Sequence, residues 1–183
     1  MAAIPKVVTY REWLEMPEVE DGIEEVVDGD IRVLPPNKLP HAVIVENLAD
    51  ALKAALDRKA VRAFTTSIGL VIRQEPLTTR EPDVAVFLKA NMIERDGYIH
   101  SAPELIVEVL SPGNTRPERE LKLRDYESLG VPEVWVVSPE AQTVEILLLQ
   151  NGRLTRDRIV ADGEIRPVRF LAAAVSVESI WPH

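Results

Sequence analysis

The run ELIVEVL at residues 104–110 constrains the fold more than any other stretch of this chain. Its apolar residues fall on both strand parities, which is typical of a β-strand that is covered on both faces. The exception is Glu108, because an ionised carboxylate in such a strand costs several kcal/mol unless it is paired, protonated or bound to a metal. The run therefore predicts a layered fold and marks Glu108 as a candidate functional residue.

Helix signals occur in three other places. Thr9 with Glu12 has the spacing of a capping box, so we expect a short helix from about Tyr10 to before Pro17. Apolar residues recur at intervals of three and four from His41 to about Lys59, which predicts a long amphipathic helix. Thr115 with Glu118, Pro117 and Gly130 then predict the start and end of a helix over about 117–129.

Strand signals surround these helices. Asp28-Gly29 and Asn151-Gly152 are strong turn signals, and they predict two hairpins. The predicted strands are 23–27, 30–34, 61–65, 68–73, 83–87, 104–110, 131–137, 143–150 and 153–160, with a last short strand and helix in the tail. We therefore expect one α/β (α+β) domain over residues 1–183, with a mixed central sheet flanked by helices and an N-terminal β-hairpin.

Composition excludes several classes of function. The sequence of 183 residues has no cysteine, so it has neither disulfides, nor thiolate zinc sites, nor a cysteine nucleophile. It has no signal-peptide pattern and no run of about 18 apolar residues, so we expect a cytoplasmic protein. The net charge of −9 argues against a chain that coats nucleic acid by bulk electrostatics.

Acidic side chains share strand faces with apolar ones, because side chains alternate along a strand. Glu25 shares its face with Ile23 and Val27, Asp83 with Ala85 and Phe87, and Glu108 with Ile106 and Leu110. Lys122 similarly lies on one helical stripe with Glu118, Tyr126 and Leu129. Three acids and one lysine are thus predicted to point toward packed or recessed regions.

Converging carboxylates without cysteine or histidine ligands suit a hard cation such as Mg²⁺ or Mn²⁺. Such an ion activates water, and a nearby lysine stabilises the negative charge that develops on a phosphate. This set of residues therefore favours phosphodiester hydrolysis.

Pro82-Asp83, followed after 24 residues by Glu108-Val109-Leu110, resembles the PD-(D/E)XK motif of restriction-endonuclease-like nucleases. In that motif the Asp and Glu hold the metal and the Lys assists catalysis. Here Leu110 occupies the lysine position. A known variation of the superfamily moves the lysine to the following helix, where this chain has Lys122.

An ordered set of motifs, over roughly residues 9 to 180, is similar to the Uma family of endonucleases with the restriction-enzyme fold. The motifs are EVVDGDI at 25–31, His41, EPDVAVF at 81–87, ELIVEVLSPGNT at 104–115, Lys122 with Tyr126, and GVPEVWVVSP at 130–139. The resemblance implies a Mg²⁺- or Mn²⁺-dependent nuclease acting on nucleic acid, with DNA the expected substrate.

By the same resemblance, Glu25 matches the N-terminal acid, Asp83, Glu108 and Val109 are the metal-binding positions, and Lys122 is the displaced lysine. Glu118 stands where the family usually has Asp, a mild departure. Because an acidic chain can form a basic groove and present two active sites by pairing, we also expect a homodimer.

Other interpretations of these residues stay open at this point. Glu108 could be satisfied by an arginine, Asp83 could cap a turn, Glu25 could pair with Arg32, and Lys122 could pair with Glu118. The first interpretation of His41 is a residue that starts a helix, and the second is a proton shuttle. The chain as a whole could be a catalytically inactive module that binds nucleic acid or protein, and glycoside hydrolysis by a carboxylate pair is a third class.

Overall fold

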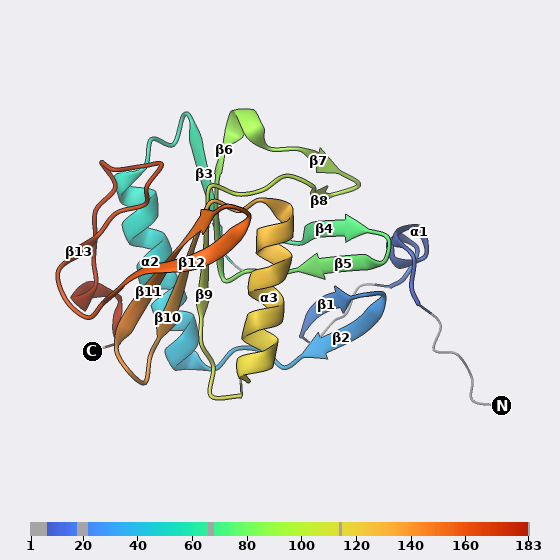
Figure 1. Ribbon diagram of the computed structural model, residues 1–183, viewed down its shortest axis with the longest axis horizontal. Helices are drawn as coiled ribbons and strands as arrows, with labels where there is room; N and C mark the ends of the chain where they lie inside the picture. Colours follow the sequence, from blue (N-terminus) through green and yellow to red (C-terminus); the bar gives the residue numbers. More distant parts are fainter. Residues whose placement is uncertain (1–6, 18–21, 66–67, 114, 183) are drawn as a thin grey trace.

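The computed structural model describes residues 7–17, 22–65, 68–113 and 115–182, and Figure 1 shows how its elements are arranged. The helices are α1 (Tyr10–Leu14), α2 (Leu39–Ala55) and α3 (Arg116–Leu129), with short 3-10 helices η1 (Lys89–Asn91) and η2 (Glu178–Ile180). The strands are β1 (Ile23–Val27), β2 (Asp30–Leu34), β3 (Val61–Thr65), β4 (Leu70–Gln74), β5 (Leu77–Arg80), β6 (Val84–Leu88), β7 (Glu94–Arg95), β8 (Tyr98–Ile99), β9 (Leu105–Val109), β10 (Glu133–Ser138), β11 (Thr143–Gln150), β12 (Arg153–Val160), β13 (Glu164–Ile165) and β14 (Val175–Ser176).

Within the described residues, the largest sheet has six strands in the order β12-β11-β10-β9-β6-β3. Strands β9 and β10 are parallel, whereas the other neighbouring pairs are antiparallel. Helices α2 and α3 lie on either side of this sheet (Figure 1). The predicted fold class, a mixed sheet flanked by helices, is thus confirmed.

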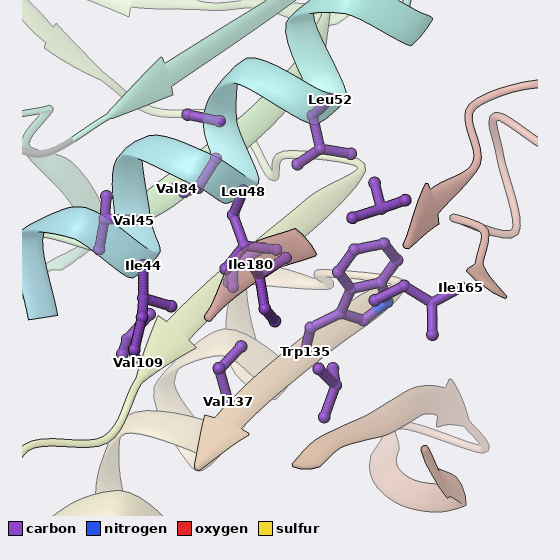
Figure 2. Close-up of a cluster of buried hydrophobic side chains, with 14 of the residues drawn as sticks. Ile44, Val45, Leu48, Leu52, Val84, Val109, Trp135, Val137, Ile165 and Ile180 are labelled. Carbon is purple, nitrogen blue, oxygen red and sulfur yellow. The ribbon is translucent and has the colours of Figure 1, made fainter. Parts of the chain in front are cut away.

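Side-chain parity divides the core into two apolar layers. On one face, Val107, Val109 and Trp135 pack with α2 and with the C-terminal segment that includes Ile180, as Figure 2 shows in part. On the other face, Ile106 packs with Tyr126 of α3. Because Glu108 has the parity of Ile106, the strand places its carboxylate on the α3 side of the sheet.

The helix ends follow their capping residues. Helices α1 and α3 both have complete capping boxes, at Thr9 and Thr115, and α3 ends at Gly130 in the left-handed conformation. Helix α2 is shorter than predicted and begins two residues earlier, at Leu39. It stops at Ala55 because Asp57 forms a turn, in which its backbone carbonyl and its side chain accept hydrogen bonds from the following residues. No helix among the described residues has both the length and the apolar character needed to cross a membrane.

The hairpin of β1 and β2 forms with the predicted bounds, and Asp28 and Gly29 supply the positive φ angles of its turn. Strand β1 lies against β5, a strand that the sequence did not predict. The buried hydroxyls of Thr79 and Thr78 accept hydrogen bonds from the backbone N–H groups of Val26 and Asp28, at 2.9 and 3.1 Å. These bonds make a polar segment compatible with burial.

Three other short strands were not predicted. Strands β7 and β8 form a hairpin around Asp96 and Gly97, and β13 pairs with β14 near the C-terminus. The predicted tail strand is β14, whereas the helix expected after it is only the 3-10 turn η2.

Candidate functional site

A cleft of about 810 Å³ opens between the β1–β2 hairpin, the first turn of α2, the end of β9 and the first half of α3. Its walls include all five predicted site residues: Glu25, Asp83, Glu108, Val109 and Lys122. These positions come from four separate segments of the chain. The fold therefore brings them to one solvent-accessible hollow, although their direct contacts fall into two groups.

The first group surrounds Glu108, whose side chain is 14% exposed. The hydroxyl of Tyr126 donates a hydrogen bond to Glu108 Oε1, and the ammonium of Lys122 lies 3.2 Å from Oε2. Burial raises the pKa of Glu108 above its ordinary value, although the charge of Lys122 acts in the opposite direction. The partly buried carboxylate of Glu108 is thus satisfied by a lysine and a tyrosine, not by an arginine.

Lys122 lies between two carboxylates, because its Nζ is also 3.1 Å from Glu25 Oε1. Burial lowers the pKa of Lys122, but the charges of Glu108 and Glu25 outweigh it, so the net pKa is raised. The side chain is therefore a permanent cation at neutral pH. Glu118 does not pair with Lys122, because its carboxylate accepts a hydrogen bond from the hydroxyl of Thr115 in the capping box, at 2.7 Å.

Glu25 is fixed from the opposite side by a buried arginine, Arg80, that no sequence pattern predicted. Arg80 Nη1 donates to Glu25 Oε2 at 2.7 Å, and the same guanidinium donates twice to Asp125 at 2.6 and 2.9 Å. Burial raises the pKa of Glu25, but Lys122 and Arg80 outweigh it and the net pKa is lowered. Arg32 faces Glu25 across the hairpin in register, yet its side chain lies 3.7 Å from Asp30. The alternative pairing of Glu25 with Arg32 is therefore wrong.

The second group joins Asp83, Val109 and His41. Asp83 Oδ2 accepts the backbone N–H of Val109 at 2.7 Å. His41 Nε2 lies 3.3 Å from the same oxygen and 3.1 Å from the carbonyl oxygen of Val109. Burial lowers the pKa of His41, but the hydrogen bond and charge of Asp83 raise it more, so the net pKa is raised. Asp83 thus bonds to the neighbouring strand and does not cap a local turn.

The donor chemistry of the cleft fits a hard cation. Asp83, Glu108 and the carbonyl of Val109 offer only oxygen, and among the described residues Asp83 Oδ1 makes no hydrogen bond. In the described part of the chain, however, no three acidic or histidine side chains stand close enough together to form a ready-made metal site. The carboxylates instead contact Lys122, whose positive charge offsets that of Glu108, and His41, which lies beside Asp83.

Comparisons with known proteins agree with this fold. The solved structure described as "a putative nuclease belonging to DUF820 from Anabaena variabilis ATCC 29413" matches with a TM-score of 0.77 and 21% sequence identity, over 94% of this chain and 97% of that chain. No curated protein matches the sequence. The model of the Uma2 family, described as "Putative restriction endonuclease", matches residues 9–178. The resemblance stated from the motifs is thereby confirmed, and this chain belongs to the Uma2 family.

Proposed function

We propose that this chain is a divalent-metal-dependent nuclease that hydrolyses phosphodiester bonds in the cleft, with DNA as the expected substrate. One observation carries the proposal. The ammonium of Lys122 lies 3.2 Å from Glu108, in a cleft that also contains Asp83. A lysine held beside Glu108, in an open hollow that also contains the carboxylate of Asp83, is an arrangement that supports metal-assisted phosphoryl chemistry.

In this proposal, Asp83, Glu108 and the carbonyl oxygen of Val109 would hold Mg²⁺ or Mn²⁺. When bound, the ion supplies a Lewis acid for the phosphate and lowers the pKa of a water molecule. Hydrolysis adds that water across one P–O ester bond of the nucleic acid.

Lys122 stabilises the charge that develops on the phosphate, because its ammonium stays protonated and donates hydrogen bonds. Glu25 keeps that ammonium beside Glu108, since one carboxylate oxygen holds Lys122 and the other is bound by Arg80. The resemblance assigns Glu25 to the catalytic set, and the contacts favour a role in holding Lys122.

The test is a cleavage assay on supercoiled plasmid, linear duplex DNA, single-stranded DNA and RNA, with Mg²⁺, Mn²⁺ or EDTA. We expect metal-dependent cleavage that falls by roughly 100-fold or more in Asp83→Asn, Glu108→Gln and Lys122→Met, as for the loss of other transition-state contacts. The matched control is Lys59→Met, which removes an exposed lysine outside the cleft. Cleavage that persists in EDTA, or in all three cleft variants, would refute the proposal.

A second candidate is a restriction-enzyme-fold module that binds nucleic acid or protein without cutting. Leu110 favours it, because that position holds an apolar side chain where the motif has its lysine. Lys122 also already neutralises two carboxylates without a metal. Nucleic-acid binding with no Mn²⁺ binding and no cleavage of any substrate would establish this candidate instead.

A further inference from the structure

The side chain of His41 contacts two of the proposed metal-binding positions, Asp83 and Val109. His41 is the third residue of α2, directly after Pro40, and its side chain is 8% exposed. The first turn of α2 thereby carries the imidazole against Asp83 and the end of β9.

The proton of this imidazole can be placed from its neighbours. Nε2 lies 3.1 Å from a carbonyl oxygen and 3.3 Å from a carboxylate oxygen, and both of these atoms only accept hydrogen bonds. Nε2 must therefore carry the hydrogen, which it shares between Val109 and Asp83 as a three-centre bond.

The other ring nitrogen of His41, Nδ1, is not accessible for hydrogen bonding. Within the described part of the chain, Nδ1 is buried and has no hydrogen-bond partner. A metal ligand or a general base needs a lone pair that the cleft can reach, and neither nitrogen offers one. His41 therefore acts through its two neighbours and does not itself bind the metal or take a proton from water.

His41, Asp83 and Val109 are each hydrogen-bonded to the other two. The N–H of Val109 donates to Asp83 Oδ2, and His41 donates both to that oxygen and to the carbonyl of Val109. This arrangement ties the start of β6 to the end of β9. It also fixes the carboxylate through Oδ2, so that Oδ1 keeps its orientation without a protein partner among the described residues.

We propose that His41 is a positioning residue that orients the carboxylate of Asp83 and the carbonyl of Val109 for a divalent cation. The inference rests on the proposed function. Residues that orient metal ligands typically change metal affinity by about 10- to 100-fold when they are replaced.

Two amides of different length test the proposal. Gln places its amide nitrogen near the position of Nε2, whereas Asn is one methylene shorter and cannot reach Val109 or Asp83. Titration calorimetry with Mn²⁺ alone, without nucleic acid, should show a dissociation constant about 10- to 100-fold weaker for His41→Asn and within about threefold of wild type for His41→Gln. The Mn²⁺ concentration for half-maximal cleavage should shift in the same order.

His100→Asn is the control, because His100 contacts Tyr10 outside the cleft and should leave the Mn²⁺ affinity unchanged. Equal affinity of His41→Asn and wild type would overturn the inference, as would a His41→Gln variant that binds as weakly as His41→Asn at an unchanged melting temperature. If Asp83→Asn abolishes Mn²⁺ binding while His41→Asn binds Mn²⁺ as tightly as wild type, only this inference fails. If the wild type does not bind Mn²⁺, the proposed function fails with it.

Discussion

Arg80 neutralises two buried carboxylates that belong to different elements, Glu25 of β1 and Asp125 of α3. All three side chains are almost fully buried, so water does not screen their interaction. Without Arg80, Glu25 would keep only Lys122 and Asp125 only Arg73 as a positively charged partner among the described residues, so part of the buried negative charge would lose its compensation. At the scale of single residues, Arg80 is thus a position where a substitution should have a large effect on folding.

We expect Arg80→Met to lower the free energy of unfolding by about 3–5 kcal/mol, the usual cost of breaking a buried ion pair. Urea denaturation followed by circular dichroism measures this change. Arg116→Met is the control, because its pair with Glu120 is exposed and should contribute less than about 0.5 kcal/mol. A loss below about 1 kcal/mol for Arg80→Met would contradict the role assigned to the network.

At the scale of elements, two glycines end segments in the left-handed conformation. Gly29 has φ of +82° in the β1–β2 turn, and Gly130 has φ of +85° after α3. A Cβ on Gly130 would meet no described atom within 4 Å, whereas one on Gly29 would collide with the side chain of Val7. Substitutions at the two positions therefore distinguish the energetic cost of a left-handed backbone from the cost of a steric clash with Val7.

Gly130→Ala should destabilise the protein by about 1–2 kcal/mol, the cost of a left-handed conformation for an L residue. Gly29→Ala should cost more, because the collision with Val7 is added to the same conformational penalty. Thermal and urea unfolding of both variants tests this order. Equal losses would mean that the segment around Val7 moves aside without penalty.

Glu145 of β11 links two other elements. It accepts a hydrogen bond from Arg119 of α3, and its other carboxylate oxygen accepts one from Arg156 of β12 at 2.6 Å. Burial raises the pKa of Glu145, but the two arginines outweigh it and the net pKa is lowered. A lowered pKa in the folded state means that the stabilisation is present above the unfolded pKa and is lost as the pH falls through the folded pKa.

Glu145→Gln should therefore cost roughly 1 kcal/mol at pH 7 and almost nothing once the wild-type carboxylate is protonated. Urea unfolding at a series of pH values from 7 down to about 3 measures the difference. A cost that stays constant over this range would show that the charge of Glu145 is not what binds α3 to β12.

Elements with local signals could be predicted from sequence, and elements stabilised by distant partners could not. The capping boxes at Thr9 and Thr115 and the turn at Asp28-Gly29 act within a few residues, so their elements lie within one or two residues of the prediction. Strand β5 was missed because Thr78, Thr79 and Arg80 look exposed until β1 and α3 bind them. Strands β7 and β8 were missed although Asp96-Gly97 is a hairpin signal that could have identified them.

The same distinction holds for the site. Strand parity and the helical stripe were enough to predict that Glu108 and Lys122 point inward, and the structure brings them together. The roles of Arg80 and His41 depend on contacts over 45 and 68 positions of sequence, which no local pattern encodes. Only the fold could assign them.

At the scale of the whole molecule, the net charge of −9 conflicts with binding a polyanion. Pairing of two chains would present one cleft to each strand of a duplex and would allow two surfaces to form a basic groove that one chain lacks. We therefore propose a homodimer. Light scattering should give a mass near twice the 20.5 kDa of one chain, and a mass equal to one chain would contradict the proposal.

The hairpin that carries Glu25 has fewer buried apolar contacts than the sheet that carries Glu108. Its apolar contacts belong to a small cluster of Trp13, Val26, Val71 and Leu77, whereas Trp135 lies in the much larger layer beside α2. Regions with few buried contacts open at a lower free energy than the core. On gradual warming, the indole of Trp13 should therefore change its fluorescence before that of Trp135, and heat inactivation should precede the melting of the main sheet.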